Sequence, residues 1–141
     1  MTTIVADLSR IGCDTFWSPT GERSSKIWRT KNKGVFGCSG DERIIARFQD
    51  WISGGKRPNQ IEDDAKNGDS FAALQLHNGE LFVWGWAMHP RKSIRAFHAI
   101  GSGADLALGA LAAGGTLEQA LEIAADFDAA TKGPFRFLKA S

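Results

Sequence analysis

The sequence predicts an α+β fold in which helices pack on the outside of stacked β-sheets. Two observations indicate strands: short apolar segments fill the first forty residues, and an Asn-Gly turn marks a hairpin in mid-chain. A third, helical periodicity in segments before and after the hairpin, adds helices. Several strands are apolar on both faces, so we expect sheets that are covered on both sides.

The length and composition suit one domain spanning residues 1–141. The hydrophobic content of 43% is enough for a core in a chain of 141 residues. We find no internal repeat, low-complexity tract or linker that would divide the chain.

Four short strands are predicted before residue 40. Turn-forming residues separate them at 18–21 and 31–34. The predicted strands are residues 2–7 (TTIVAD), 11–16 (IGCDTF), 25–30 (SKIWRT) and 34–39 (GVFGCS).

The first helix is predicted to begin at a capping box. In this box the Ser39 hydroxyl accepts the Glu42 N–H, and the Glu42 side chain returns to the Ser39 N–H. A glycine pair at 54–55 ends the helix, and the polar segment 56–70 is predicted to be a surface loop. The apolar stripe of this helix consists of Ile44, Ile45, Phe48, Trp51 and Ile52.

The hairpin is the strongest local pattern in the chain. Residues 71–77 and 80–86 flank Asn78-Gly79, which supplies the positive φ angles of a tight turn. A further strand is expected around residues 93–99.

Two helices and a last strand follow. The stretch 100–115 is rich in Ala, Leu and Gly and can pack closely against a sheet. A second capping box, from Thr116 to Gln119, starts the next helix, and residues 135–140 form the last strand. The predicted core stripe of the second helix is Leu117, Ala120, Leu121, Ala124 and Phe127.

The charge pattern excludes several classes of partner. A net charge of +1, with both signs spread along the chain, argues against nucleic acid, an acidic membrane or an acidic substrate. The densest basic run is interpreted as a solvated strand and turn. This run contains Arg23, Lys26, Arg29, Lys31 and Lys33.

Cysteine and histidine placement predicts a cytoplasmic protein without a metal or cofactor. Cys13 and Cys38 lie in apolar runs without paired spacing, so we expect buried free thiols. His77, His89 and His98 are too far apart to resemble a metal cluster. No segment resembles a signal peptide or the roughly 20 apolar residues of a membrane span, so no membrane is expected.

Thr2 follows Met1 directly and opens the segment TTIVAD. If Met1 is removed, the Thr2 hydroxyl lies beside its own α-amine, a base that titrates near about 7.7 to 8.0. Met-Thr starts are common, so this residue alone indicates catalysis only weakly.

Three other polar residues stand out. Asp128 follows Leu121 and Ala124 on the core stripe, so it either meets water at a frayed helix end or meets a cation or donors inside. Ser102, between two glycines, has the simple interpretation of a helix cap. Lys26 lies inside a predicted strand and can reach solvent along its stem.

Six segments carry a family resemblance in their order along the chain: TTIVAD, IGCDT, SSKIWR, GVFGCSG, AIGSGADLALGAL and ALEIAADFDAAT. Together they resemble the proteasome β-subunits and, more closely, the peptidase subunit of the bacterial ATP-dependent HslUV protease. These proteins are N-terminal-nucleophile (Ntn) hydrolases. The resemblance spans nearly the whole chain, with a shortened middle around 53–95, and implies a four-layer αββα sandwich of two stacked, mainly antiparallel sheets between helix layers.

The resemblance also implies roles for individual residues. Thr2 matches the nucleophile, Asp14 the carboxylate near it, and Lys26 the cation beside the threonine hydroxyl. A nearby ammonium would lower the pKa of the α-amine by like-charge repulsion and keep it basic, while Asp14 holds Lys26 charged and oriented.

Four more positions follow from the same comparison. Ser102 matches a serine that hydrogen-bonds near the amine, and Asp128 with Thr131 matches an Asp-x-x-Ser pair. Gly37 falls where relatives offer a backbone N–H to the oxyanion, although its gap from Lys26 differs by a residue or so.

The implied activity is that of a threonine endopeptidase acting on peptides or unfolded proteins. The resemblance further implies a homo-oligomeric ring and an ATPase unfoldase as partner. Compact proteins of this type also resemble ones encoded by phages, which leaves the ATPase and substrate open. Two alternatives are a catalytically silent ring or assembly protein and an Ntn amidohydrolase that acts on small amides.

Overall fold

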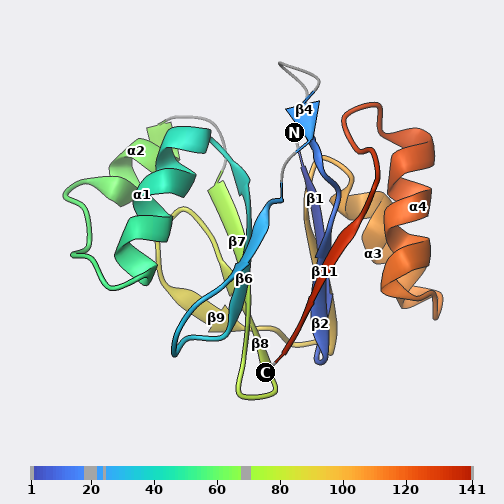
Figure 1. Ribbon diagram of the computed structural model, residues 1–141, viewed down its shortest axis with the longest axis horizontal. Helices are drawn as coiled ribbons and strands as arrows, with labels where there is room; N and C mark the ends of the chain where they lie inside the picture. Colours follow the sequence, from blue (N-terminus) through green and yellow to red (C-terminus); the bar gives the residue numbers. More distant parts are fainter. Residues whose placement is uncertain (1, 18–21, 24, 68–70, 141) are drawn as a thin grey trace.

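Two β-sheets stack face to face between two pairs of helices, as Figure 1 shows for the computed structural model. The structure describes residues 2–17, 22–23, 25–67 and 71–140. Helices α1 and α2 cover the outer face of one sheet, and α3 and α4 cover the outer face of the other (Figure 1). The predicted α+β architecture, with helices outside stacked sheets, is confirmed.

The first sheet is antiparallel throughout and has the strand order β10-β1-β2-β11. Its strand β1 is buried over its first four residues, because α4 packs on one face and the second sheet on the other. The strands are β1 (Thr3–Asp7), β2 (Arg10–Cys13), β10 (Phe97–Gly101) and β11 (Arg136–Lys139).

The second sheet has the order β5-β6-β7-β8-β9 and contains the predicted hairpin. Asn78 and Gly79 have φ angles of 52° and 74°, as a tight turn between β7 and β8 requires. The strands are β5 (Ile27–Arg29), β6 (Val35–Gly40), β7 (Phe71–His77), β8 (Glu80–Trp84) and β9 (Pro90–Lys92), and a separate ribbon pairs β3 (Phe16–Trp17) with β4 (Glu22–Arg23).

Three apolar layers hold the structure together. Aliphatic side chains fill the space between the sheets, aromatic side chains fill the space under α1 and α2, and small residues pack under α3 and α4. The small residues let α3 and α4 approach β1 and β10 closely. The helices are α1 (Glu42–Ile52), α2 (Ile61–Asn67), α3 (Ala104–Ala112) and α4 (Leu117–Phe127).

Two local predictions on the side of α1 are wrong. The N-cap of α1 is Asp41, whose carboxylate accepts the Arg43 N–H at 2.8 Å, because Ser39 is part of β6 and pairs with β7. The predicted loop 56–70 contains α2, which is anchored by the buried side chains of Ile61 and Ala65. Both corrections arise from tertiary packing that local sequence does not encode.

Two predictions near the other helices also need correction. The strand expected at 93–99 begins only at Phe97, because residues 93–96 cross from β9 in one sheet to β10 in the other. Phe127 is 77% exposed and does not join the core stripe. The capping box of Thr116 and Gln119 is confirmed, with both reciprocal hydrogen bonds present.

Both cysteines are free and buried, as predicted. Burial raises the pKa of the Cys13 thiol to about 11, and it raises that of Cys38 well above its ordinary value. Both thiols are therefore protonated at neutral pH and behave as small apolar side chains. Over the described residues, every helix is too short or too polar to cross a membrane. The predicted turn at 18–21 lies outside the described residues.

Replacing Phe48 with alanine is expected to lower the free energy of unfolding by about 3–5 kcal/mol. The ring is fully buried and contacts Phe36, Phe71 and Trp84 with centroid distances of 5.0–5.8 Å. Phe127→Ala is the matched control, because the same side chain there is mostly exposed, and its expected change is below about 0.5 kcal/mol. Equal losses for the two variants in urea denaturation would contradict the described packing.

Candidate functional site

The candidate site lies at the start of β1, where four chain segments converge. These segments are the end of β2, the residue before β5, the turn from β10 into α3 and the loop from α4 to β11. The start of β1 and the α4–β11 loop lie at the same end of the molecule in Figure 1.

Thr2 is held by a close approach of β10. The residue is only 6% exposed, and its carbonyl oxygen accepts the Ser102 N–H at 2.8 Å. Gly101 has a φ of +100°, and a Cβ there would overlap the Thr2 carbonyl oxygen. This position therefore requires glycine, and the turn that follows places Ser102 against Thr2.

Asp14 and Lys26 form a buried ion pair beside the start of β1. The Lys26 Nζ lies 2.9 Å from Asp14 Oδ1 and 2.6 Å from the Phe16 carbonyl oxygen. The Asp14 side chain is 0% exposed and the Lys26 side chain is 7% exposed. Lys26 precedes β5 and is not inside the strand. Because its Nζ bonds to Asp14, its stem points into the site and does not run out to solvent.

Two backbone donors complete the environment of the Asp14 carboxylate. Oδ1 also accepts the Thr3 N–H at 3.0 Å, and Oδ2 accepts the Lys132 N–H at 3.3 Å. The ammonium and the Thr3 N–H thus share one oxygen, which places the positive charge next to the peptide between Thr2 and Thr3. Several donors offset the cost of burying a carboxylate.

Ser102, Asp128 and Thr131 form a second polar cluster, which meets the first residues of the chain through the Ser102 N–H. The hydroxyls of Ser102 and Thr131 both donate to Asp128 Oδ2 at 2.6 Å, and the Ala130 N–H donates to Oδ1 at 3.2 Å. The helix-cap interpretation of Ser102 is wrong, because Gly103 is the N-cap of α3 and no side chain caps it. Asp128 follows α4 as its C-cap and meets internal donors.

The environment of Asp128 favours its ionised form. Burial raises the pKa of this carboxyl, but the hydrogen bonds from Ser102, Thr131 and the Ala130 N–H outweigh burial and place the pKa below its ordinary value. At neutral pH the cluster is therefore an anion surrounded by neutral donors.

Gly37 lies in the middle of β6, opposite Ile27 of β5 and Leu74 of β7. A Cβ there would lie 2.7 Å from Ile4 Cγ2, so packing between the sheets already requires glycine. The Cys38 N–H donates to the Lys26 carbonyl oxygen at 3.3 Å, and alternation along the strand turns the Gly37 N–H toward β7. The oxyanion role of Gly37 stays a prediction.

Two polar residues of the site were missed from sequence. Thr3 is fully buried, and its hydroxyl lies 2.7 Å from the Thr131 hydroxyl and 3.1 Å from the Gly103 nitrogen. The buried Thr15 donates to the Pro134 carbonyl oxygen at 2.6 Å and ties the α4–β11 loop to the end of β2. A threonine at a buried position of an apolar strand is the pattern that could have indicated Thr3.

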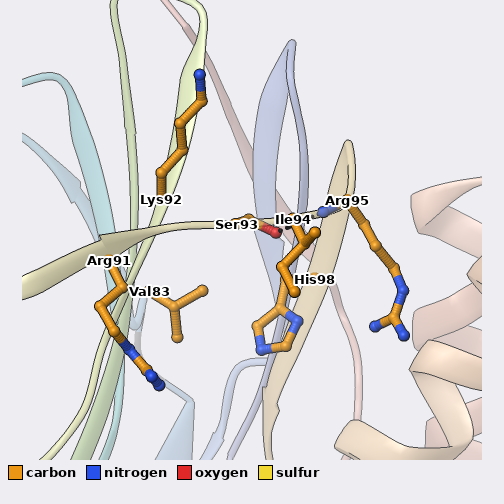
Figure 2. A pocket seen from close by; sticks show the side chains of 7 residues that line it. All are labelled: Val83, Arg91, Lys92, Ser93, Ile94, Arg95 and His98. Carbon is orange, nitrogen blue, oxygen red and sulfur yellow. Dashed lines mark hydrogen bonds between the residues drawn. The ribbon is translucent and has the colours of Figure 1, made fainter.

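Two surface grooves lie elsewhere and contain none of the predicted residues. One, of about 250 Å³, is formed at the β9–β10 crossing, where Arg91 and Arg95 lie on either side of His98 (Figure 2). Burial, and then the neighbouring Arg95, lower the pKa of His98. The other, of about 350 Å³, lies between α3 and α4. The first groove is lined by Ser93 and His98, but no hydrogen bond joins the Ser93 hydroxyl to the His98 ring among the described residues. The second is lined by no serine, threonine, cysteine or histidine, so the cluster around Thr2 is the stronger candidate.

Comparison with known proteins supports the fold. Neither a family model nor a curated protein matches the sequence. HslV from Trypanosoma brucei is similar in structure, with a TM-score of 0.70, 18% identity and coverage of 98% of both chains. BPH from Thiobacillus denitrificans, alone and in complex with epoxomicin, gives 0.70 at 19% identity and covers 99% of this chain and 98% of its own.

These identities establish a shared fold and nothing finer. The αββα sandwich that the sequence resemblance implies is therefore confirmed, and the chain has the fold of HslV-type peptidases. The three structures come from a trypanosome and a bacterium, so they give no support to a phage origin.

Asp14→Asn is expected to lower the free energy of unfolding by about 3–5 kcal/mol, because a buried ammonium loses its carboxylate partner. Lys26→Met is expected to be similarly costly, since it leaves the carboxylate without its cation. The double variant should be more stable than the sum of the two losses predicts, which a double-mutant cycle in urea measures. Strict additivity would show that the pair is not coupled.

Asp128→Asn should reveal a pH-dependent contribution to stability. The folded-state pKa is below the unfolded value of about 3.9, so the ionised carboxylate stabilises the fold above that pH. The contribution is lost as pH falls through the folded-state pKa. We expect the difference in unfolding free energy between wild type and variant to be constant from about pH 6 to 8 and to shrink below about pH 4. A difference that does not change with pH, or one matched by the exposed Asp105→Asn control, would contradict this.

Proposed function

We propose that this chain is a threonine peptidase of the N-terminal-nucleophile type, with Thr2 as nucleophile once Met1 has been removed. The observation that carries the proposal is the convergence of a buried ion pair and a partly exposed cluster of hydroxyls around a carboxylate at the start of β1. Asp14 and Lys26 form the ion pair, and Ser102 belongs to the cluster around Asp128. The ion pair of Asp14 and Lys26 is costly to bury in an apolar sandwich, and catalysis at Thr2 accounts for its place there.

The reaction needs only the groups of the first residue as nucleophile and base. The Thr2 hydroxyl oxygen attacks the carbonyl carbon of a peptide bond, and its proton passes to the α-amine. The resulting ammonium gives that proton to the leaving nitrogen as the C–N bond breaks, which leaves an ester on Thr2. Water, deprotonated by the same amine, then hydrolyses the ester and regenerates the hydroxyl.

The ion pair is proposed to tune the amine. The Lys26 ammonium disfavours a second positive charge nearby, so the α-amine stays neutral and basic near neutral pH. Asp14 fixes the position of the ammonium, and the Lys26 charge also stabilises the oxyanion that develops on the substrate carbonyl. The Gly37 N–H is not assigned a role in this mechanism, because it turns toward β7 within the second sheet.

The second cluster is proposed to orient the amine. The Ser102 N–H holds the Thr2 carbonyl oxygen, while the Ser102 hydroxyl is directed to Asp128. Thr131 adds a second hydroxyl to the same carboxylate oxygen. This arrangement fixes polar acceptors beside the first residue, as a positioned base requires.

Several broader features belong to the same proposal. The whole chain is proposed to act as one domain that assembles into a homo-oligomeric ring in the cytoplasm and cleaves peptides or unfolded proteins. The HslV neighbour from a trypanosome and the epoxomicin complex of BPH are the supporting likenesses. An ATPase unfoldase is the proposed partner.

Covalent labelling of Thr2 tests the proposal. Purified protein, shown by intact mass to lack Met1, is expected to form a single adduct with epoxomicin, located on Thr2 by peptide mapping. Thr2→Ala should abolish the adduct, because both the hydroxyl and its pairing with the amine are required. Thr30→Val, which removes a hydroxyl far from the site, is expected to label as wild type does.

The outcomes separate the alternatives. No adduct on protein with a free Thr2 amine would refute the peptidase mechanism and favour a silent ring protein. An adduct without cleavage of fluorogenic peptides, but with hydrolysis of small amides, would favour an amidohydrolase. Light scattering measures the assembly state independently of labelling.

A further inference from the structure

Thr3 occupies a place in the site that neither the sequence nor the proposed mechanism explains. It is fully buried in β1, and it is the only residue whose hydrogen bonds, among those of the described residues, reach both polar clusters. Its N–H donates to Asp14 Oδ1, and its hydroxyl meets the Thr131 hydroxyl at 2.7 Å.

The direction of each hydrogen bond in this chain of hydroxyls can be assigned. The Asp128 carboxylate is ionised and only accepts, so the Thr131 hydroxyl must donate its single proton to Oδ2. The Thr131 oxygen then accepts in the 2.7 Å contact, and the Thr3 hydroxyl is the donor there. The Gly103 N–H in turn donates to the Thr3 oxygen at 3.1 Å. All the hydrogen bonds are therefore donated in one direction, from the Gly103 N–H to Thr3, from Thr3 to Thr131 and from Thr131 to Asp128.

The backbone at Gly103 packs closely against the hydroxyls of Thr3 and Thr131. A Cβ on Gly103 would lie 2.5 Å from the Thr3 oxygen and 3.2 Å from the Thr131 oxygen. Only glycine therefore fits at position 103 while the Thr3 and Thr131 hydroxyls keep these positions. Thr131 is also fully buried, so no solvent competes for its hydroxyl.

We propose that Thr3 is a positioning residue for the Thr2 site, and that its hydroxyl locks Thr131 in the rotamer that donates to Asp128. The inference rests on the proposed function, because the orientation of Asp128 matters for catalysis only if Thr2 is the nucleophile. Thr3 acts through Thr131 and touches no substrate. Its N–H bond to Asp14 makes the same residue hold the ammonium side of the site as well.

Removing the hydroxyl has a defined electrostatic consequence. Without that donor, the Thr131 oxygen has an unfilled acceptor position, and the Thr131 side chain loses the contact that fixes its rotamer against Asp128. The carboxylate then loses stabilisation, so its pKa rises. One charge adds to these hydrogen bonds: the N-terminal amine also lowers the pKa of Asp128. Asp126 on the last turn of α4 is exposed, and the Lys132 ammonium lies over the Phe16 ring.

Thr3→Val tests the proposal, because valine keeps the shape of threonine and removes only the hydroxyl. Thr3→Ser restores the donor. Thr30→Val is the matched control, since the Thr30 hydroxyl also donates once, to Gly34, and accepts once, from Lys33. All variants are prepared with Met1 removed and compared at equal folded fraction.

Two readouts are expected to move together. The rate of Thr2 modification by epoxomicin should fall by roughly 10- to 100-fold in Thr3→Val and return most of the way in Thr3→Ser. The acidic limb of its pH profile, which reports protonation of the α-amine, should shift to higher pH, because a less stabilised Asp128 carboxylate holds the protonated amine more strongly. The pKa of Asp128, followed by NMR titration of its carboxyl carbon, should rise as well. Thr30→Val should change neither readout.

Opposite results are equally clear. A Thr3→Val variant with wild-type labelling rate and an unchanged Asp128 titration would overturn the proposal, as would a slow Thr3→Ser variant. If Thr3→Val does not fold, Thr3→Cys keeps the volume with a weaker donor and should give an intermediate rate and titration. Wild-type values for the cysteine variant would again overturn it.

Failure of the proposed function would look different. If wild-type protein with a free Thr2 amine is not modified, the peptidase mechanism fails, but the Asp128 titration still tests whether Thr3 acts through Thr131. A shift in that titration without any labelling would place Thr3 in a structural network of the fold and remove its role in positioning a catalytic amine.

Discussion

The Asp14 carboxylate is the group on which the rest of the site depends. It is completely buried and binds the Lys26 ammonium, the Thr3 N–H and the Lys132 N–H. These donors come from the edge of the second sheet, from β1 and from the loop after α4. A buried anion destabilises a fold unless all its donors are in place, so one carboxylate fixes the relative position of both sheets and the last loop.

Close approach is the second constraint, and glycine makes it possible. At Gly101 and Gly103 the turn into α3 comes so near to β1 that a side chain would overlap the Thr2 carbonyl or the Thr3 hydroxyl. The Ser102 N–H can reach Thr2 only because of this proximity. The packing of small residues under α3 and α4 thus also serves the site. It brings the start of α3, at Gly103, and the loop after α4, at Thr131, to the same residue, Thr3.

Features governed by short-range chemistry could be predicted from the sequence, and those that need a tertiary partner could not. The Asn78 turn and the Thr116 cap depend on neighbouring residues alone. The burial of Ile61, which anchors α2, depends on the underside of α1, so local sequence suggested a loop. In the site, family resemblance supplied candidates at conspicuous positions, but Thr3 was hidden because a threonine in a strand is ordinary until its hydrogen bonds are seen.

In the proposed mechanism the two clusters act on the α-amine with opposite sign. The Lys26 ammonium favours the neutral amine, whereas an ionised Asp128 favours the protonated one. The hydroxyls of Ser102 and Thr131 and the Ala130 N–H stabilise the Asp128 charge by hydrogen bonds, so the carboxylate does not need the amine as its counter-ion. The amine is then left free to serve as the base. The neutral donors around Asp128 therefore matter as much as the ion pair. They decide whether the Lys26 ammonium or the Asp128 carboxylate sets the protonation state of the α-amine.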